Sequence, residues 1–124
     1  KPDGVQRKLT GEILSIIEEQ DFVITKLKKM DISKEMAELH YEEHKDKSFF
    51  NNLIQFITSG PVIAVELEGD EAVTKVRDLM GATNPSDAEP GTLRHKFGTE
   101  LEKNVVHGSD SQESAERELN IFFG

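Results

Sequence analysis

The residue best suited to chemistry is His107, in the stretch NVVHGSDSQES at residues 104–114. A glycine, two serines and an aspartate follow it, which is typical of a helix start, where backbone N–H groups and the helix dipole favour an anion. The stretch lacks the G-x-S-x-G pattern of serine hydrolases, so the serines are not predicted to be nucleophiles. The pattern alone favours an ordinary histidine beside a helix cap.

Glu118 adds a second functional group to this interpretation. On a helix predicted for residues 111–122, Ala115, Leu119 and Phe122 form a buried stripe, and Glu118 lies at its flank. A half-buried carboxylate there can hydrogen-bond one imidazole nitrogen of His107, fix the tautomer and leave the other nitrogen free to attack.

A second pair of histidines, His40 and His44, lies four residues apart in HYEEH. This spacing places two metal ligands on one helix face. The sequence offers no obvious third ligand and does not match H-E-x-x-H. A solvated helix face is therefore favoured over a metal-binding module.

Basic residues near the long segment 82–104 suit phosphate, because the planar guanidinium pairs with two oxygens. They are Arg77 and Arg94, with Thr83, Thr92 and Lys96 nearby. A solvated surface arginine is the alternative for each. Phe49 and Phe50 begin a predicted helix, either as two core residues or with one exposed as a stacking platform.

Composition limits the class of protein. The 124 residues predict a single domain, residues 1–124, and the net charge of −9 argues against nucleic acid as the main partner. A few converging cations can still bind a polyphosphate. The absence of cysteine excludes disulfides and thiolate chemistry, and no apolar run or signal layout predicts a membrane partner. A reducing compartment such as the cytoplasm is compatible with this composition.

The helices and strands that position these residues are predicted from hydrophobic periodicity and from the residues that typically begin or end such elements. Helices are predicted over residues 10–20 with Thr10 as cap, 33–45, 49–58, 70–80 ending at Gly81, and 111–122; strands over 22–30 and 62–67, the second buried on both faces. KPDG reads as a turn, residues 82–104 as a loop, and 104–106 as a short strand. Two strands before the loop are too few for an independent sheet, so we expect a further strand ahead of Lys1.

Together these stretches resemble the nucleoside diphosphate kinase family, in a bacterial-like version. The resemblance covers essentially the whole chain and is carried by KPDGVQR (1–7), HYEEHKDKSFF (40–50), SGPVIAVELEG (59–69), LMGATNPSDAEPGTLR (79–94) and NVVHGSDSQESAERE (104–118). It implies an α+β, ferredoxin-like sandwich with a four-stranded antiparallel sheet covered by helices, its first strand ahead of Lys1. It also implies a cytoplasmic homo-oligomer, a hexamer or tetramer.

The resemblance implies an activity for His107. The family transfers the γ-phosphate of ATP or another nucleoside triphosphate to nucleoside diphosphates by a ping-pong route through a phosphohistidine. His107 would carry the phosphate, Glu118 would hold its other nitrogen, Ser109 would support that pair and Tyr41 would steer near the phosphates.

The resemblance also assigns nucleotide-binding residues. The ribose and phosphates would be held by Lys1, Asn104, Arg77, Thr83 and Arg94, and the base by Phe49, Leu53 and Leu101. Mg²⁺ would bridge the phosphates, held mainly by the nucleotide rather than by a protein cage. Ser48 stands where many relatives have proline.

A non-catalytic interaction module that keeps the fold is the alternative function. It predicts that at least one residue needed for the reaction is replaced. The sequence retains all four that were checked, namely Lys1, Arg94, Asn104 and His107.

Overall fold

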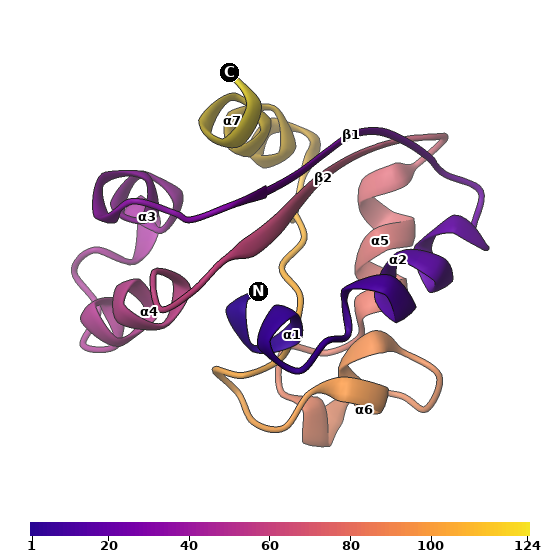
Figure 1. The fold of residues 1–124 in the computed structure, drawn as a ribbon, viewed down its shortest axis with the longest axis horizontal. Helices are drawn as coiled ribbons and strands as arrows, with labels where there is room; N and C mark the ends of the chain where they lie inside the picture. The colour runs from indigo at the N-terminus through magenta and orange to yellow at the C-terminus, as the bar shows by residue number, and fades with distance from the viewer.

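The sheet of the computed structural model, which describes residues 1–124, has two antiparallel strands, β1 (Val23–Met30) and β2 (Val62–Glu68) (Figure 1). Its register runs from Val23 opposite Glu68 to Met30 opposite Val62, with an irregularity at Thr25. The Thr25 hydroxyl donates to the Glu66 carboxylate at 2.7 Å. Both predicted strands are therefore confirmed.

Seven helices surround this sheet. They are α1 (Pro2–Gln6), α2 (Thr10–Glu18), α3 (Lys34–His40), α4 (Phe50–Ile57), α5 (Ala72–Met80), α6 (Leu93–Phe97) and α7 (Gln112–Phe123), with 3₁₀ turns at Glu42–His44 and Pro85–Asp87. In Figure 1, α3 and α4 lie at one end of the strands, α2 and α5 at the other, and the segment before α7 crosses behind β2. The α+β class is confirmed.

Residues 1–124 form two of the four strands that the family resemblance implies. The expected strand at residues 104–106 does not form, because Val105 has a positive φ of 63° that turns the backbone out of the extended conformation. Its N–H donates to the Asp3 carboxylate at 3.1 Å, and its carbonyl accepts from the Lys1 backbone nitrogen at 2.9 Å. These contacts replace a sheet ladder. The strand expected ahead of Lys1 lies outside these residues.

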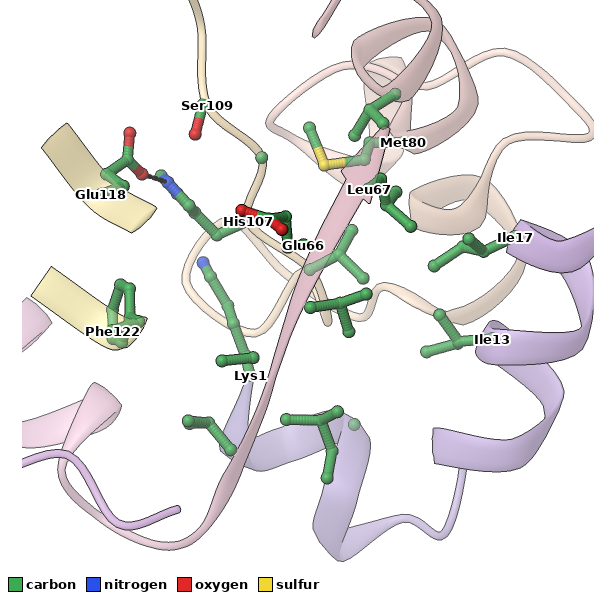
Figure 2. Close-up of a pocket in the computed structure, with 18 of the residues that line it drawn as sticks. Lys1, Ile13, Ile17, Glu66, Leu67, Met80, His107, Ser109, Glu118 and Phe122 are labelled. Carbon is green, nitrogen blue, oxygen red and sulfur yellow. Dashed lines mark hydrogen bonds and ion pairs between the residues drawn. The ribbon is translucent and has the colours of Figure 1, made fainter. Parts of the chain in front are cut away.

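Burial of β2 on both faces is also wrong. Val62 is buried, but the residues that follow it to Leu67 are only partly buried. The physical reason is that β2 pairs with β1 alone, so its other edge is unpaired and opens on an apolar cavity of about 290 Å³. Figure 2 shows β2 passing through the side chains that line this cavity.

Several local predictions change in detail. KPDG begins α1 instead of a free turn, because Pro2 suits a first helical position. Leu9 precedes α2, so the predicted cap Thr10 is already helical. The helix predicted over 33–45 keeps its Ser33 cap but ends at His40. The predicted loop 82–104 contains α6, capped by the Thr92 side chain.

Two groups of buried apolar side chains hold the elements together. One comprises Ile32, Ala37, Tyr41, Ile54, Ile57 and Val62, which join α3 and α4 to the start of β2. The other comprises Ile13, Leu93 and Val105, which join α2 and α6 to the turn before His107. The turn carrying His107 is thus anchored in a core cluster by the residue two positions before it.

Candidate active site

His107 and Glu118 form the hydrogen-bonded pair that the sequence predicts. His107 follows the Val105 turn, and Glu118 lies within α7. The Ser111 side chain caps the start of this helix by accepting the Ser114 N–H at 3.0 Å. Nε2 of His107 is hydrogen-bonded to Oε1 of Glu118 (Figure 2). This contact leaves Nδ1 free on a side chain that is 39% exposed.

Glu118 is more buried than its predicted place at the flank of the stripe. It is the buried residue of α7, whereas Ala115, Leu119 and Phe122 are only partly buried. Burial alone would raise its pKa, but the hydrogen bond and charge of His107, with a further contribution from the Ser109 hydroxyl, hold the pKa below its usual value. A carboxylate at this position accepts Nε2–H and makes Nδ1 the nitrogen with a lone pair.

His40 completes the surroundings of His107. Its ring packs edge-on against that of His107 with 4.5 Å between centroids, and its Nδ1 lies 3.7 Å from Oε1 of Glu118. Burial and the neighbouring His107 lower the pKa of His40 to about 3, so its imidazole is neutral. The solvated helix face predicted for His40 and His44 is wrong, because His40 is buried, α3 ends at His40, and His44 lies in the next turn.

Tyr41 packs behind this group. Its ring centroid is 4.5 Å from that of His40, and burial together with the charge of Glu118 raises its pKa to about 12. The phenol therefore stays protonated at neutral pH and can only act as a hydrogen-bonding group.

Lys1, Asn104 and Thr83 are linked in series. The Lys1 ammonium donates to the Asn104 side-chain oxygen at 2.7 Å, and the Asn104 amide donates to the Thr83 carbonyl at 2.9 Å. Burial and the nearby Arg94 lower the pKa of Lys1 to about 8. Figure 2 shows Lys1 extending toward His107. Lys1 and His107 thus line the same cavity.

Arg94 and Arg77 bring further positive charge to the same turn. Arg94 is buried and donates to the Gly81 carbonyl at 3.0 Å and the Val106 carbonyl at 2.8 Å. Arg77 is exposed and makes only a long 3.5 Å contact with the Gly108 carbonyl. Burial and the charge of Arg77 lower the pKa of Arg94. Two guanidiniums this close favour an anion between them.

The two phenylalanines separate as one of the alternatives predicted. Phe50 packs against the first core cluster, whereas Phe49 is 40% exposed, with the Lys47 ammonium 5.7 Å from its ring centroid. Leu53 lies one helical turn along α4 and is partly buried. Leu101 is exposed in the segment before Asn104.

Sequence reasoning missed two residues of the site. Asp3 holds the Val105 turn and belongs to KPDG, a stretch that was predicted only to be a turn. His40 packs against His107 and belongs to HYEEH, where the spacing pointed to His44 as the partner of His40.

One cluster of three potential metal ligands exists, formed by His40, His107 and Glu118. It is rich in nitrogen, whereas Mg²⁺ requires oxygen ligands in octahedral geometry. The residues around His107 therefore suit Mg²⁺ that arrives on phosphate oxygens.

The family model described as nucleoside diphosphate kinase matches residues 1–124. The chain belongs to this family. Nucleoside diphosphate kinases of Desulforamulus reducens and Halalkalibacterium halodurans are 57% and 56% identical to it over 123 residues. Each alignment covers 99% of this chain, with 83% of the first relative and 84% of the second.

Solved structures agree in fold with this nucleoside diphosphate kinase family member. A nucleoside diphosphate kinase from Halobacterium salinarum in complex with CDP has a TM-score of 0.96 and 49% identity, with 99% of this chain and 82% of that one covered. The apo enzyme of Encephalitozoon cuniculi has a TM-score of 0.98 and 35% identity, with 100% and 84% covered. None of the helices of this chain has the length and apolar character needed to cross a membrane.

Proposed function

We propose that this chain transfers the γ-phosphate of a nucleoside triphosphate to a nucleoside diphosphate through a phosphohistidine on His107. The observation that carries the proposal is the pair of His107 and Glu118, in which the carboxylate holds Nε2 and leaves Nδ1 free beside a group of cations. Belonging to the nucleoside diphosphate kinase family supports the same reaction.

The first half-reaction is an attack by Nδ1 of His107 on the γ-phosphorus. The N–P bond forms as the P–O bond to the β-phosphate breaks, and the nucleoside diphosphate leaves with that electron pair. Glu118 stabilises the positive charge that develops on the ring, since its carboxylate is bound to Nε2. Ser109 and Tyr41 support this pair, because the first lowers the pKa of Glu118 and the second packs on His40.

The second half-reaction reverses the first with a different nucleotide. A terminal phosphate oxygen of the incoming diphosphate attacks the same phosphorus, the N–P bond breaks and the imidazole recovers its lone pair. One site thus serves donor and acceptor in turn, which is the basis of ping-pong kinetics.

Cations around His107 would stabilise the transferred phosphoryl group, whose charge spreads over its equatorial oxygens. Lys1, Arg77 and Arg94 supply this charge, and Asn104 and Thr83 position Lys1 and the sugar. When bound to the nucleotide phosphates, Mg²⁺ neutralises further charge on them. No carboxylate cage for it is needed in the protein.

The base would rest on Phe49. An exposed aromatic ring stacks on any base because every base has a π-face, and Leu53 and Leu101 would border the ring on either side. Recognition through stacking does not distinguish the hydrogen-bonding edges of bases. The proposal therefore includes broad base specificity.

The complete fold and assembly belong to this proposal. A four-stranded, ferredoxin-like sheet would form if an extended segment paired with the free edge of β2 across the apolar cavity. Exposed Val23 and Leu27 on β1 suit contacts between copies in a homo-oligomer, a hexamer or tetramer. A cytoplasmic location, where nucleotides are interconverted, completes the proposal.

Labelling with γ-³²P-ATP and Mg²⁺ tests the reaction. We expect an acid-labile, base-stable label on the protein, lost on addition of nucleoside diphosphate, and no label in His107→Ala. His95→Ala, at an exposed histidine on α6, is the matched control and should label fully. An unlabelled parent protein, or label retained in His107→Ala, would overturn the proposal and favour the non-catalytic module.

A further inference from the structure

His40 carries a buried nitrogen that the proposed phosphoryl transfer does not use. Its Nδ1 has no hydrogen-bond partner, although the side chain is only 4% exposed. Oε1 of Glu118 lies 3.7 Å from it, beyond hydrogen-bonding distance. Buried polar atoms normally have a partner, so this nitrogen calls for a ligand of its own.

The partnerless nitrogen points at a second imidazole and a carboxylate. Ligand atoms of His40, His107 and Glu118 all lie within 4.8 Å of one another. Two histidines and a glutamate are a donor set that binds zinc in enzymes that keep a fourth position open. The exposed side of His107 leaves room for that fourth ligand, a water molecule.

The charges suit a transition metal better than Mg²⁺. Neutral imidazoles bind Zn²⁺ well, and affinities of such sites rise along the first row of divalent metals toward copper and zinc. His40 carries no extra proton to displace, because burial and the neighbouring His107 lower its pKa to about 3. Glu118 stays ionised and compensates part of the metal charge. Only the Nε2 proton of His107 has to move, and the free Nδ1 takes it, so the imidazole stays neutral.

We infer that Zn²⁺ binds His40 Nδ1, His107 Nε2 and Glu118, and that the Nε2 proton of His107 moves to Nδ1 as the metal takes its place. The ligand atoms must separate slightly, since Oε1 of Glu118 directly contacts Nε2 when no metal lies between them. Rotation of the Glu118 carboxylate about its side chain provides this movement.

A metal on Nε2 changes the nucleophile on the other side of the ring. The proton that moves to Nδ1 occupies the lone pair that would attack phosphorus, and the metal separates the ring from the carboxylate that would stabilise its positive charge. Nδ1 then cannot act as the nucleophile. Zn²⁺ bound to these residues would therefore inhibit phosphoryl transfer. This inhibition rests on the proposed function, whereas zinc binding does not.

Calorimetry with ZnCl₂ tests the site in the absence of nucleotide. We expect one Zn²⁺ per chain, with no proton released from the three ligands, so the binding enthalpy should be the same in buffers of different ionisation enthalpy. His40→Phe keeps an aromatic ring without a ligand atom. It should lose at least about tenfold in zinc affinity, since even second-shell partners of metal ligands contribute 10–100-fold.

Two further variants keep this test decisive. His44→Phe makes the same change at the histidine outside the cluster and should bind zinc as the parent does. Glu118→Gln preserves the shape of the ligand and should weaken zinc binding even if His40→Phe fails to fold. Parent-like zinc affinity in folded His40→Phe, or in Glu118→Gln, would overturn the inference.

Labelling separates this inference from the proposed function. Protein loaded with Zn²⁺, freed of excess metal and given Mg²⁺ and γ-³²P-ATP should take up at least about tenfold less label initially than metal-free protein. A chelator should restore it. If metal-free protein takes no label, the proposed function fails while calorimetry still decides the zinc site. Full labelling of the zinc-loaded protein would overturn the inhibitory role.

Discussion

The two ends of the proposed nucleotide site are built in opposite ways. At the phosphate end, Asn104 and Arg94 are 2% and 6% exposed and are fixed by hydrogen bonds to carbonyls of distant segments. At the base end, Phe49 is 40% and Leu101 56% exposed. Rigid, buried polar groups select what they touch, whereas an exposed ring accepts any flat partner. From this difference we expect the site to select its ligand through the phosphates and not through the base.

Arg94→Ala should break the phosphate end and give the largest effect. We expect kcat/KM to fall about 10²–10³-fold, as when one donor to a developing negative charge is removed. Arg94→Lys keeps the charge with fewer donors and should recover part of the loss. Steady-state kinetics with ATP and a nucleoside diphosphate measures both. Activity equal to the parent in a folded Arg94→Ala would show that the buried guanidinium is structural only.

Phe49→Ala should affect the base end less. Loss of stacking by a partly exposed ring corresponds to about 1 kcal/mol, or roughly fivefold in KM. The increase should be similar for adenine, guanine and cytosine nucleotides, with kcat nearly unchanged, and Phe49→Tyr should behave as the parent. An effect confined to one base would contradict recognition by stacking alone.

Acid titration tests the buried His40 through the stability of the fold and not through kinetics. His40 has a pKa lowered from 6.5 to about 3, so between these values the unfolded chain binds a proton that the folded chain does not. Its contribution to stability is complete above pH 6.5 and is lost as pH falls toward 3.

The free energy of unfolding, measured by urea titration, should therefore fall by up to about 1.4 kcal/mol per pH unit in this window because of His40. His40→Phe should reduce the slope. An unaltered slope in His40→Phe would show that the buried ring is protonated in the folded protein.

Local pattern predicted most of the elements. Strands at 22–30 and 62–67 followed from β-rich runs, and the end of α5 followed from Gly81, whose φ is 85° and whose α-carbon lies so close to Thr92 that no side chain fits. Glu118 followed from helical periodicity. In each case the decisive information lies within a few residues of the element.

Features that depend on distant residues could not be predicted this way. The turn at Val105 is held by Asp3, which lies 102 positions earlier in the chain. His40 reaches His107 only because α3 and α7 pack together, with Arg117 of α7 donating to the Leu39 carbonyl at 3.0 Å. The resemblance to known sequences named the site residues, but it did not give these tertiary contacts.

The Val105 turn has a consequence for the order in which the molecule forms. Its left-handed backbone is unfavourable for a branched side chain, so it persists only once Asp3 and the Lys1 backbone have docked on it. Closing a loop of about 100 residues is slow relative to local helix formation. His107, the proposed phosphate carrier, would thus be aimed in one of the last steps of folding. In a chain emerging from the ribosome, the proposed site residues from Lys1 to Asn104 would be present before Val105 appeared. The turn, and with it the complete site, could form only after that.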